Sequence, residues 1–570
     1  MALERIADRV AETDVLVVGG GIAGCAAAAK AAENGLKVIL AEKAKTDRSG
    51  TSGQGIDHYG GAFPRGMTPK EFVEAVERMG ELACYGGAPF SDPTRIYRLY
   101  ANGMWGIEEL EKLGVTMRWD DGEFRYVSFM IGEGMPFLRV HWMNVKPEMA
   151  QGVRKRKVNV FERVMIVDLL TNNGTVVGAT AVDTRTGEFI VIKAKAVVIA
   201  TGQFSRCYDP ETPVPWAYKF RYHWCPASIS GDGWAMAYRA GAELANMEQA
   251  GAGYRFHDDL ALSFGNVGNE GIMCRFTTWD GEETHWPPHA MQLRELERKG
   301  KDPFYYSLEH LPDDFHKRIE VAYVDERLVS FKIAEDRGFN PRTHWFEMMD
   351  MRPNQLMVPP GIDADADFMS TLKGLYAIGD CVAGCHDVAN AATGGFLVGD
   401  IAQDFVNKTP DPVIDEAQVE SQKETAMAPL ATKDGTEPLE LESAIRYVCN
   451  RYIGLFRAEG KLREGKRRLG SLRREFLPRL KASNPHELMR ALEVRSIMDL
   501  AELHLQACLE KKETTAAGHA SSGHIRIDYP EPNPAWSGML TYQRLENGKP
   551  VLEIRKPAAM KLPDDHKEDR

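Results

Sequence analysis

A complete dinucleotide-binding unit near the N-terminus constrains this chain more than any other feature. An apolar strand sequence over residues 13–18 runs into a Gly-Gly-Gly-Ile-Ala-Gly turn, an alanine-rich helical stretch follows, and a second apolar strand ends at Glu42. Gly19 permits the tight strand-to-helix turn, Gly21 lets a pyrophosphate approach the backbone, and Gly24 lets the helix pack closely on the strand. Glu42 is placed to accept hydrogen bonds from an adenosine ribose. We therefore expect a protein built around a bound nucleotide cofactor.

Several later segments fit the same cofactor. The polar, glycine-rich stretch 43–55 is too long for a simple turn, and such loops usually wrap a ligand. An apolar strand ending at Gly202 is expected to re-enter the sheet, and the Ser-Gly-Asp-Gly sequence from Ser230 is expected to begin a helix that presents backbone amides. A further strand ends at Asp380, an acidic residue suited to ribityl or pyrophosphate hydroxyls. Thr393-Gly-Gly is expected to precede an apolar helix whose N-terminus faces the electron-rich end of a reduced flavin.

Length and charge limit the other classes of function. At 570 residues the chain is long enough for several domains. Its 70 basic and 82 acidic residues give a formal net charge of -12, which argues against a nucleic acid partner. One basic stretch stands out, over residues 461–479. We expect it to be the solvated face of a helix, and docking to an acidic partner protein is the alternative.

Neither a targeting segment nor a metal site is evident. Residues 1–12 carry charge throughout, and no run of about 18 apolar residues occurs. We therefore expect a cytoplasmic protein with no direct membrane insertion. The nine cysteines include no CxxC pair, so we expect neither a metal nor an iron-sulfur site in this chain. Any cluster that exchanges electrons with it must then lie on another subunit.

Taken in order, these segments resemble one family. The glycine-rich unit, the wrapping loop with its sequence Arg-Ser-Gly-Thr-Ser-Gly-Gln-Gly over 48–55, the strand ending at Gly202, the Gly-Asp-Gly-Trp helix and the strand ending at Asp380 follow one another as in the flavoproteins of succinate dehydrogenase, fumarate reductase and adenylylsulfate reductase. The likeness runs from about residue 12 to 405. The sequence Gly-His-Ile-Arg-Ile-Asp-Tyr-Pro over 523–530 is similar to the family's C-terminal region.

This resemblance implies an α/β fold, in which a Rossmann-type FAD-binding domain with an inserted α+β capping domain is followed by a C-terminal helical domain. The expected boundaries are 1–254 and 346–410 for the two parts of the FAD-binding domain, 255–345 for the cap, 411–512 for the helical domain and 513–570 for a C-terminal tail region. It also implies that the cofactor is FAD and that the electron-transfer partner is an iron-sulfur, ferredoxin-like subunit. The residues expected to contact FAD are Gly19, Gly21, Ile22, Ala23, Gly24, Glu42, Lys43, Ser49, Gly50, Thr51, Gln54, Gly55, Ala200, Thr201, Gly202, Asp232, Gly379, Asp380, Gly394, Gly395 and Leu397.

Departures from the family pattern narrow the expected chemistry. Succinate dehydrogenases carry a histidine in the first serine-rich loop that bonds covalently to FAD, whereas residues 48–51 here contain none, so the FAD is expected to be noncovalent. The His-Pro-Thr run of the fumarate and succinate enzymes is absent from 246–257, and no arginine precedes Gly-Asn-Glu-Gly at 268–271. The Asn-Arg-Leu-Gly-Gly sequence of the fumarate and succinate enzymes is replaced over 389–395 by a sequence that contains no arginine. A dicarboxylate needs cationic side chains to bind its carboxylates, so hydride exchange with fumarate or succinate is disfavoured.

The cap is more similar to another branch. Residues 293–305 resemble the cap of the flavoprotein of adenylylsulfate reductase, in which an arginine and a histidine near the flavin hold the substrate anion; Arg255 and His386 are the corresponding positions here. His386 would move a proton, because the pKa of an unperturbed histidine lies near neutrality, or would be a simple hydrogen-bonding residue. Arg255 and His257 would contact the anion or be ordinary cap residues. His58 would face the substrate or brace the wrapping loop.

Three functions remain open from the sequence. The first is a catalytic FAD-dependent oxidoreductase that exchanges electrons between a small, anionic substrate and an iron-sulfur partner, like adenylylsulfate reductase. The second is a reductase of activated C=C bonds, like fumarate reductase, with a different acid in place of the missing arginine. The third is a non-catalytic flavin electron-transfer component of a larger complex, which the loss of the clamping arginines favours.

Overall fold

The computed structural model describes residues 3–60, 91–128, 136–142, 144–208, 226–256, 275–284, 290–314, 316–317, 336, 340, 342–356, 359–385, 387–517, 522–559 and 561. The helices in these residues are α1 (Leu3–Ile6), α2 (Ile22–Glu33), α4 (Pro93–Ala101), α5 (Gly103–Leu113), α6 (Val145–Lys155), α7 (Asp232–Arg239), α9 (Ala290–Arg298), α11 (Val388–Lys408), α12 (Glu416–Ala431), α13 (Pro438–Val448), α14 (Glu459–Glu475) and α15 (Pro485–Glu510). Short helical turns are η1 (Thr46–Arg48), η2 (Thr51–Gln54), η7 (Gly379–Cys381), η8 (Cys449–Ile453), η9 (Leu477–Arg479) and η10 (Pro534–Trp536).

The strands of these described residues form four sheets. They are β1 (Arg9–Val18), β2 (Val38–Glu42), β3 (Ile56–Tyr59), β4 (Arg125–Ser128), β5 (Pro136–Trp142), β6 (Asn159–Glu162), β7 (Val164–Asn172), β8 (Thr175–Asp183), β9 (Phe189–Ile199), β10 (Leu244–Ala245), β11 (Ala250–Phe256), β12 (Arg275–Thr278), β13 (Glu283–Thr284), β14 (Phe304–Ser307), β15 (Trp345–Gln355), β16 (Gly361–Ile362), β17 (Leu375–Ala377), β18 (Phe456–Arg457), β19 (Thr515–Ala517), β20 (Ser522–Arg526), β21 (Leu540–Glu546) and β22 (Lys549–Arg555).

The central sheet has the strand order β6-β2-β1-β9-β8-β7, and β17 pairs with the end of β9. Strands β6, β2, β1, β9 and β17 run parallel, whereas β8 and β7 follow β9 as antiparallel neighbours. Residues Val15–Val18 of β1 and Val38–Ala41 of β2 are apolar and buried, as expected for parallel strands that are covered on both faces. The register aligns Val18 with Ala41 and Ile199, and Ala377 with Ile199. The segments that follow these residues therefore all leave the sheet at the carboxyl ends of the parallel strands.

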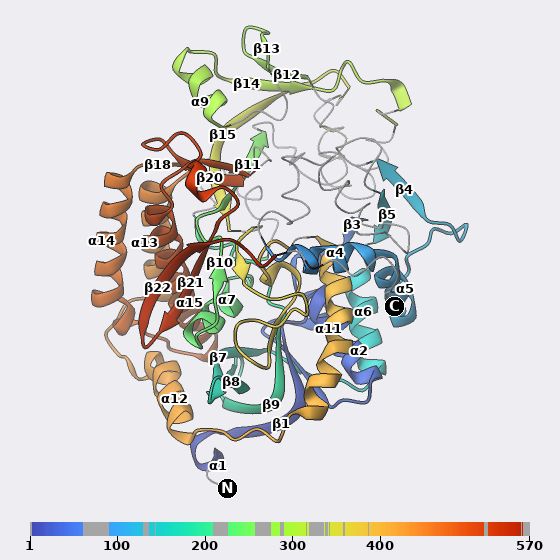
Figure 1. Cartoon of the computed structure of the whole chain (residues 1–570), viewed down its shortest axis with the longest axis vertical. Helices are drawn as coiled ribbons and strands as arrows, with labels where there is room; N and C mark the ends of the chain where they lie inside the picture. Colours follow the sequence, from blue (N-terminus) through green and yellow to red (C-terminus); the bar gives the residue numbers. More distant parts are fainter. Residues whose placement is uncertain are drawn as a thin grey trace.

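Helices α2 and α11 lie side by side against this sheet (Figure 1). A Cβ on Gly395 would lie 2.5 Å from the carbonyl oxygen of Ala23, so only glycine permits this approach. The prediction that Thr393-Gly-Gly precedes the helix is wrong, since α11 begins at Val388 and the Asp387 side chain accepts a hydrogen bond from the Val388 amide. Both glycines lie inside the helix, where Gly395 forms the contact with α2 and Gly394 faces Leu99 and Phe368.

Strands β11 and β15 connect the central part with the cap, which Figure 1 shows above it with β12, β13, β14 and α9. The expected cap residues 255–345 lie mostly between these two strands. The residues expected to form the C-terminal tail region include strands of two sheets, since β20 pairs with β11 and β21 pairs with β10. The C-terminal segment thus pairs both with β11, the strand that leads into the cap, and with β10, the strand before it.

Helices α12 to α15 form the helical region, at the left in Figure 1. Helix α15 begins behind Asn484, whose side chain accepts a hydrogen bond from the Glu487 amide at 3.0 Å. Most of the basic stretch lies on α14, with exposed pairs such as Arg463 and Glu459 at 2.6 Å, which confirms the predicted solvated helix face. Within the described ranges, no helix combines the length and the apolar character needed to cross a membrane.

The mainly parallel central sheet with its flanking helices, together with the helical region, confirms the predicted fold class.

Candidate functional site

The predicted pyrophosphate cradle lies where β1 meets α2. Gly19 has a φ of +99°, and a Cβ on it would lie 2.6 Å from the carbonyl oxygen of Ala200. A Cβ on Gly24 would lie 1.9 Å from the carbonyl oxygen of Gly19, so the helix packs directly on the turn. Gly21 instead faces open space, with no atom nearer than 4.0 Å to its would-be Cβ. The first-turn amides, those of Ile22 and Ala23 among them, therefore have room for an anionic group.

Glu42 closes β2 beside this cradle. Its carboxylate accepts hydrogen bonds from the Gly20 amide at 2.7 Å and the Ala44 amide at 2.6 Å. A carboxylate has about four lone-pair positions, so acceptor capacity remains for ribose hydroxyls. The nearby Thr46 Oγ1 and the Oδ1 of Asp232 are buried and have no hydrogen-bond partner among the described residues. Buried polar atoms that lack a hydrogen-bond partner are consistent with a site that binds a nucleotide.

The wrapping loop folds back over the start of α2. The Ser49 hydroxyl donates to the carbonyl oxygen of Gly20 at 2.9 Å, and a Cβ on Gly50, whose φ is +79°, would lie 3.1 Å from the Cα of Gly21. Thr51 and Gln54 bound the short turn η2, and Gly55 follows it. Lys146 of α6, fully buried, also donates to the Gly20 carbonyl. The sequence analysis missed this lysine, because nothing near residue 146 marks it as a neighbour of the cradle.

Two other predicted segments meet the cradle at the sheet edge. Thr201 follows β9, and its hydroxyl lies 3.3 Å from the Cys381 sulfur, which also donates to the carbonyl oxygen of Gly202 at 3.3 Å. A Cβ on Gly379 would lie 3.0 Å from that of Ala23, so the turn carrying Asp380 lies against the first turn of α2. The structure thus gathers residues 19–24, 200–202 and 379–380 at one place.

The remaining predicted FAD contacts lie on α11. Gly394, Gly395 and Leu397 are in its second and third turns rather than at its start. Gly395 faces Ala23 of α2, so its closest neighbour is protein backbone. Two residues before Gly395, the Thr393 hydroxyl lies 3.1 Å from the hydroxyl of Tyr59, the residue after His58. The end of β3 therefore lies beside the first turns of α11.

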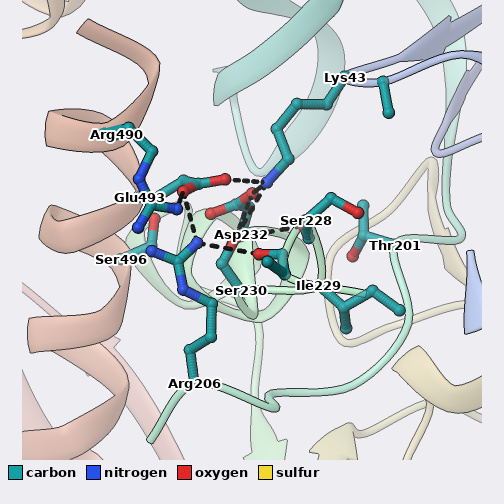
Figure 2. Close-up of polar contacts among 12 residues, drawn as sticks. Lys43, Thr201, Arg206, Ser228, Ile229, Ser230, Asp232, Arg490, Glu493 and Ser496 are labelled. Carbon is teal, nitrogen blue, oxygen red and sulfur yellow. Dashed lines mark hydrogen bonds and ion pairs between the residues drawn. The ribbon is translucent and has the colours of Figure 1, made fainter. Parts of the chain in front are cut away.

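Lys43 and Asp232, both expected to contact FAD, belong to a buried ion network (Figure 2). The Lys43 ammonium donates to Asp232 at 2.6 Å, to Glu493 of α15 at 2.7 Å and to the Ser230 hydroxyl at 3.0 Å. Burial alone would lower the pKa of Lys43, but the charges of Asp232 and Glu493 outweigh it and raise that pKa. Lys43 therefore stays protonated and joins three segments of the fold.

The network continues into the helical region. Arg206 pairs with Glu493 and with Glu442 of α13, and Arg490 lies 2.8 Å from Glu493 and 3.0 Å from Glu442. Burial would raise the pKa of Glu493, but Lys43 and the two arginines lower it to about 2. Sequence analysis missed Glu493, Arg206 and Glu442, because residues so far apart along the chain show no common pattern.

The four predicted catalytic residues are only partly placed. His386 and His257 lie outside the described residues. His58 lies on β3 and Arg255 lies on β11, opposite Met349 of β15, and only their backbone positions are described. In the described parts of the chain, no group of three or more His, Cys, Asp or Glu side chains is placed to hold a metal ion.

Comparisons with known proteins bear on the cofactor and the fold. The sequence profile of the FAD binding domain matches residues 14–253, and that of the fumarate reductase flavoprotein C-terminus matches residues 442–567. An uncharacterized FAD-dependent oxidoreductase of Methanocaldococcus jannaschii is 24% identical over 92% of this chain and 95% of its own length. One of the polypeptides of the fumarate reductase (CoM/CoB) of Methanothermobacter marburgensis is 23% identical over 94% of this chain and 97% of its own length.

A solved structure shows the same fold over nearly the whole chain. Adenylylsulfate reductase from Archaeoglobus fulgidus superposes with a TM-score of 0.82 at 24% identity, covering 97% of each chain. The family profiles confirm FAD as the predicted cofactor, and the solved structure confirms the fold. The predicted domain boundaries and site residues stay predictions.

Proposed function

Because this chain is an FAD-dependent oxidoreductase of the family of succinate dehydrogenase and fumarate reductase flavoproteins, we propose that it exchanges electrons between a small anionic substrate and a separate iron-sulfur protein, in the manner of adenylylsulfate reductase. The observation that carries the proposal is the meeting of residues 19–24, 200–202 and 379–380 at one sheet edge, directly before the segment with His386. Ligands of open α/β sheets bind at the carboxyl ends of the strands.

The chain's own residues supply the cofactor site. The cradle would hold the pyrophosphate and Glu42 would accept hydrogen bonds from the ribose hydroxyls. The loop that Ser49 holds against Gly20 would cover them. FAD, when bound, supplies the exchange of two electrons with a substrate and of single electrons with a partner. No histidine lies at 48–51, so the cofactor is held without a covalent bond. Precipitation with acid should release all of the flavin into the supernatant, and flavin retained in the pellet would contradict this.

Arg255 and His386 are the residues assigned to the substrate. Arg255 would hold an anion through a charge-assisted hydrogen bond, and His386 would hold or move a proton at the imidazole. The cap strand β11 carries Arg255 from the central part toward the cap, and β20 fixes that strand by pairing at Ala250 and Gly251. The substrate would thus lie between the cap and the sheet edge.

An anaerobic titration of the FAD-loaded protein with sulfite, with and without AMP, tests the proposal. We expect low sulfite to bleach the oxidised flavin absorbance and AMP to change the extent of reduction. His386→Ala and Arg255→Ala should weaken the response to sulfite without releasing FAD. No response at high sulfite would remove this substrate class.

Reduction of an activated C=C bond is the second candidate. The observation that favours it is the match to the fumarate reductase of Methanothermobacter marburgensis over 94% of this chain. The missing clamping arginines at 268–271 and 389–395 weigh against a dicarboxylate. Oxidation of a reduced viologen that depends on an added enoate, together with no response to sulfite, would support this candidate. Neither activity in a protein that assembles with its partner would support the non-catalytic role.

A further inference from the structure

The buried network of Figure 2 joins the cofactor side of the sheet to the helical region. Lys43 directly follows Glu42, Asp232 begins α7, and Glu493 lies in the first half of α15. Only Glu493 contacts both Lys43, at 2.7 Å, and the arginines of the helical side, with Arg490 at 2.8 Å, among the described residues of the network. Its side chain is 1% exposed. One carboxylate therefore connects the two parts of the molecule.

Each end of this connection reaches predicted FAD contacts. Glu42, the residue before Lys43, is held by the Gly20 and Ala44 amides. Asp232 is followed by Gly233, whose would-be Cβ lies 2.2 Å from the Thr201 hydroxyl. We therefore expect a backbone shift at Lys43 to reach Glu42, its neighbour in the chain, and a shift at the start of α7 to reach Thr201, which Gly233 approaches closely.

We propose that Glu493 is a positioning residue for the FAD site: by holding Lys43 it fixes the ribose-binding end of β2, so that cofactor binding and docking of α15 strengthen each other. A bound cofactor fixes the segments after β2 and β9, which places Lys43 and Asp232 for the carboxylate of α15. A docked α15 fixes the same segments before the cofactor arrives. Such coupling between two binding events is reciprocal by thermodynamic necessity.

The charges explain why this contact is sensitive. A buried ion pair that loses one member leaves an uncompensated charge, which is far costlier than the pair itself. Without the Glu493 carboxylate, Asp232 is the one ionic partner left to Lys43 among the residues that the structure describes, and Arg206 keeps Glu442. We expect Lys43 and the adjoining residues to move toward water, away from the position that orders Glu42.

The test compares Glu493→Gln with the matched control Glu464→Gln. Glu464 is a carboxylate on α14 whose side chain is 34% exposed, against 1% for Glu493, and it also pairs with two arginines, Arg467 at 2.7 Å and Arg468 at 2.8 Å. Apoprotein is titrated with FAD, and the Kd and the FAD-induced shift of Tm are measured. We expect Glu493→Gln to raise the Kd about tenfold and to reduce the shift, within the usual range of coupling between sites. The control should change neither.

A second comparison separates positioning from general destabilisation. If Glu493 acts through Lys43, adding Glu493→Gln to a Lys43→Met protein should change the Kd for FAD by less than about twofold. An equal loss of FAD affinity with and without Lys43 would overturn the proposal, as would an unchanged FAD-induced Tm shift in Glu493→Gln.

Hydrogen exchange gives the reciprocal measurement. FAD should slow amide exchange along α15 in the unmodified protein and should do so less in Glu493→Gln. Should Glu493→Gln fail to fold, Glu493→Asp keeps the charge but shortens the side chain, and the same loss of coupling is expected. This inference rests on the proposed FAD site, and failure to bind FAD in the unmodified protein would count against the proposed function instead, so the two failures are distinguishable.

Discussion

Two neighbouring regions of the molecule, the glycine-rich cradle at the start of α2 and the charged contact between α15 and the sheet, are stabilised by different means. In the cradle, Gly24 brings backbones so close that a single Cβ would clash with a carbonyl oxygen, and Gly395 of the adjoining helix α11 does the same. At the contact with α15, Glu493 and Glu442 satisfy a group of buried cations. Gly24 and Gly395 therefore tolerate no added Cβ, whereas the charged contact tolerates no lost carboxylate.

Removing a carboxylate from the charged contact should have the largest effect. Glu442 is 1% exposed and pairs with Arg206, Arg446 and Arg490. Glu442→Gln keeps a similar shape but leaves these guanidinium groups short of a counterion, so we expect the free energy of unfolding to fall by about 3–5 kcal/mol. Chemical denaturation at neutral pH measures it.

The control for this prediction is again Glu464→Gln on α14. An exposed carboxylate contributes little, because water and salt screen its pairs, so the denaturation midpoint should not change measurably. Equal losses from Glu442→Gln and Glu464→Gln would mean that burial does not distinguish the two regions.

Acid should weaken the same contact. The pKa of Glu493 is lowered in the folded protein from 4.5 to about 2, so its contribution to stability is present above pH 4.5 and is lost as the pH falls toward 2. A shift of this size corresponds to about 3 kcal/mol. The free energy of unfolding should therefore fall less steeply below pH 4.5 in Glu493→Gln than in the unmodified protein. Parallel curves would show that Glu493 titrates alike in both states.

The two regions also differ in how far they can be predicted from the sequence. The residues of the cradle, Gly19, Gly24 and Glu42, are close along the chain, and the geometry of a dinucleotide-binding turn requires each of these residue types at its position. The contact with α15 joins residues 43, 206, 442 and 493, and a charged side chain on a helix carries no sign of its distant partner. The position of Lys43 after Glu42 accordingly predicts a cofactor contact, whereas its ion pairs with Asp232 and Glu493 are visible only in the folded chain.

An extra methyl group at the helix contact should have an intermediate effect. A Cβ on Gly395 would lie 2.5 Å from the Ala23 carbonyl oxygen and 2.7 Å from Ala26 Cβ. Gly395→Ala must therefore push α11 away from α2, and we expect a loss of about 1–3 kcal/mol together with weaker FAD binding. Denaturation and FAD titration measure the two effects. Stability at or above that of the unmodified protein would show that the helices can separate without cost.

The same substitution on α14 should have the smallest effect and the opposite sign. Gly460 lies in the first turn of that helix, and a Cβ there would meet no atom within 4 Å. Alanine is the better helix former because it loses less backbone entropy on folding, so Gly460→Ala should raise the free energy of unfolding by about 0.5 kcal/mol. A shift of the denaturation midpoint measures this gain. If Gly460→Ala and Gly395→Ala changed stability alike, helix propensity rather than the close approach of α2 and α11 would explain both results.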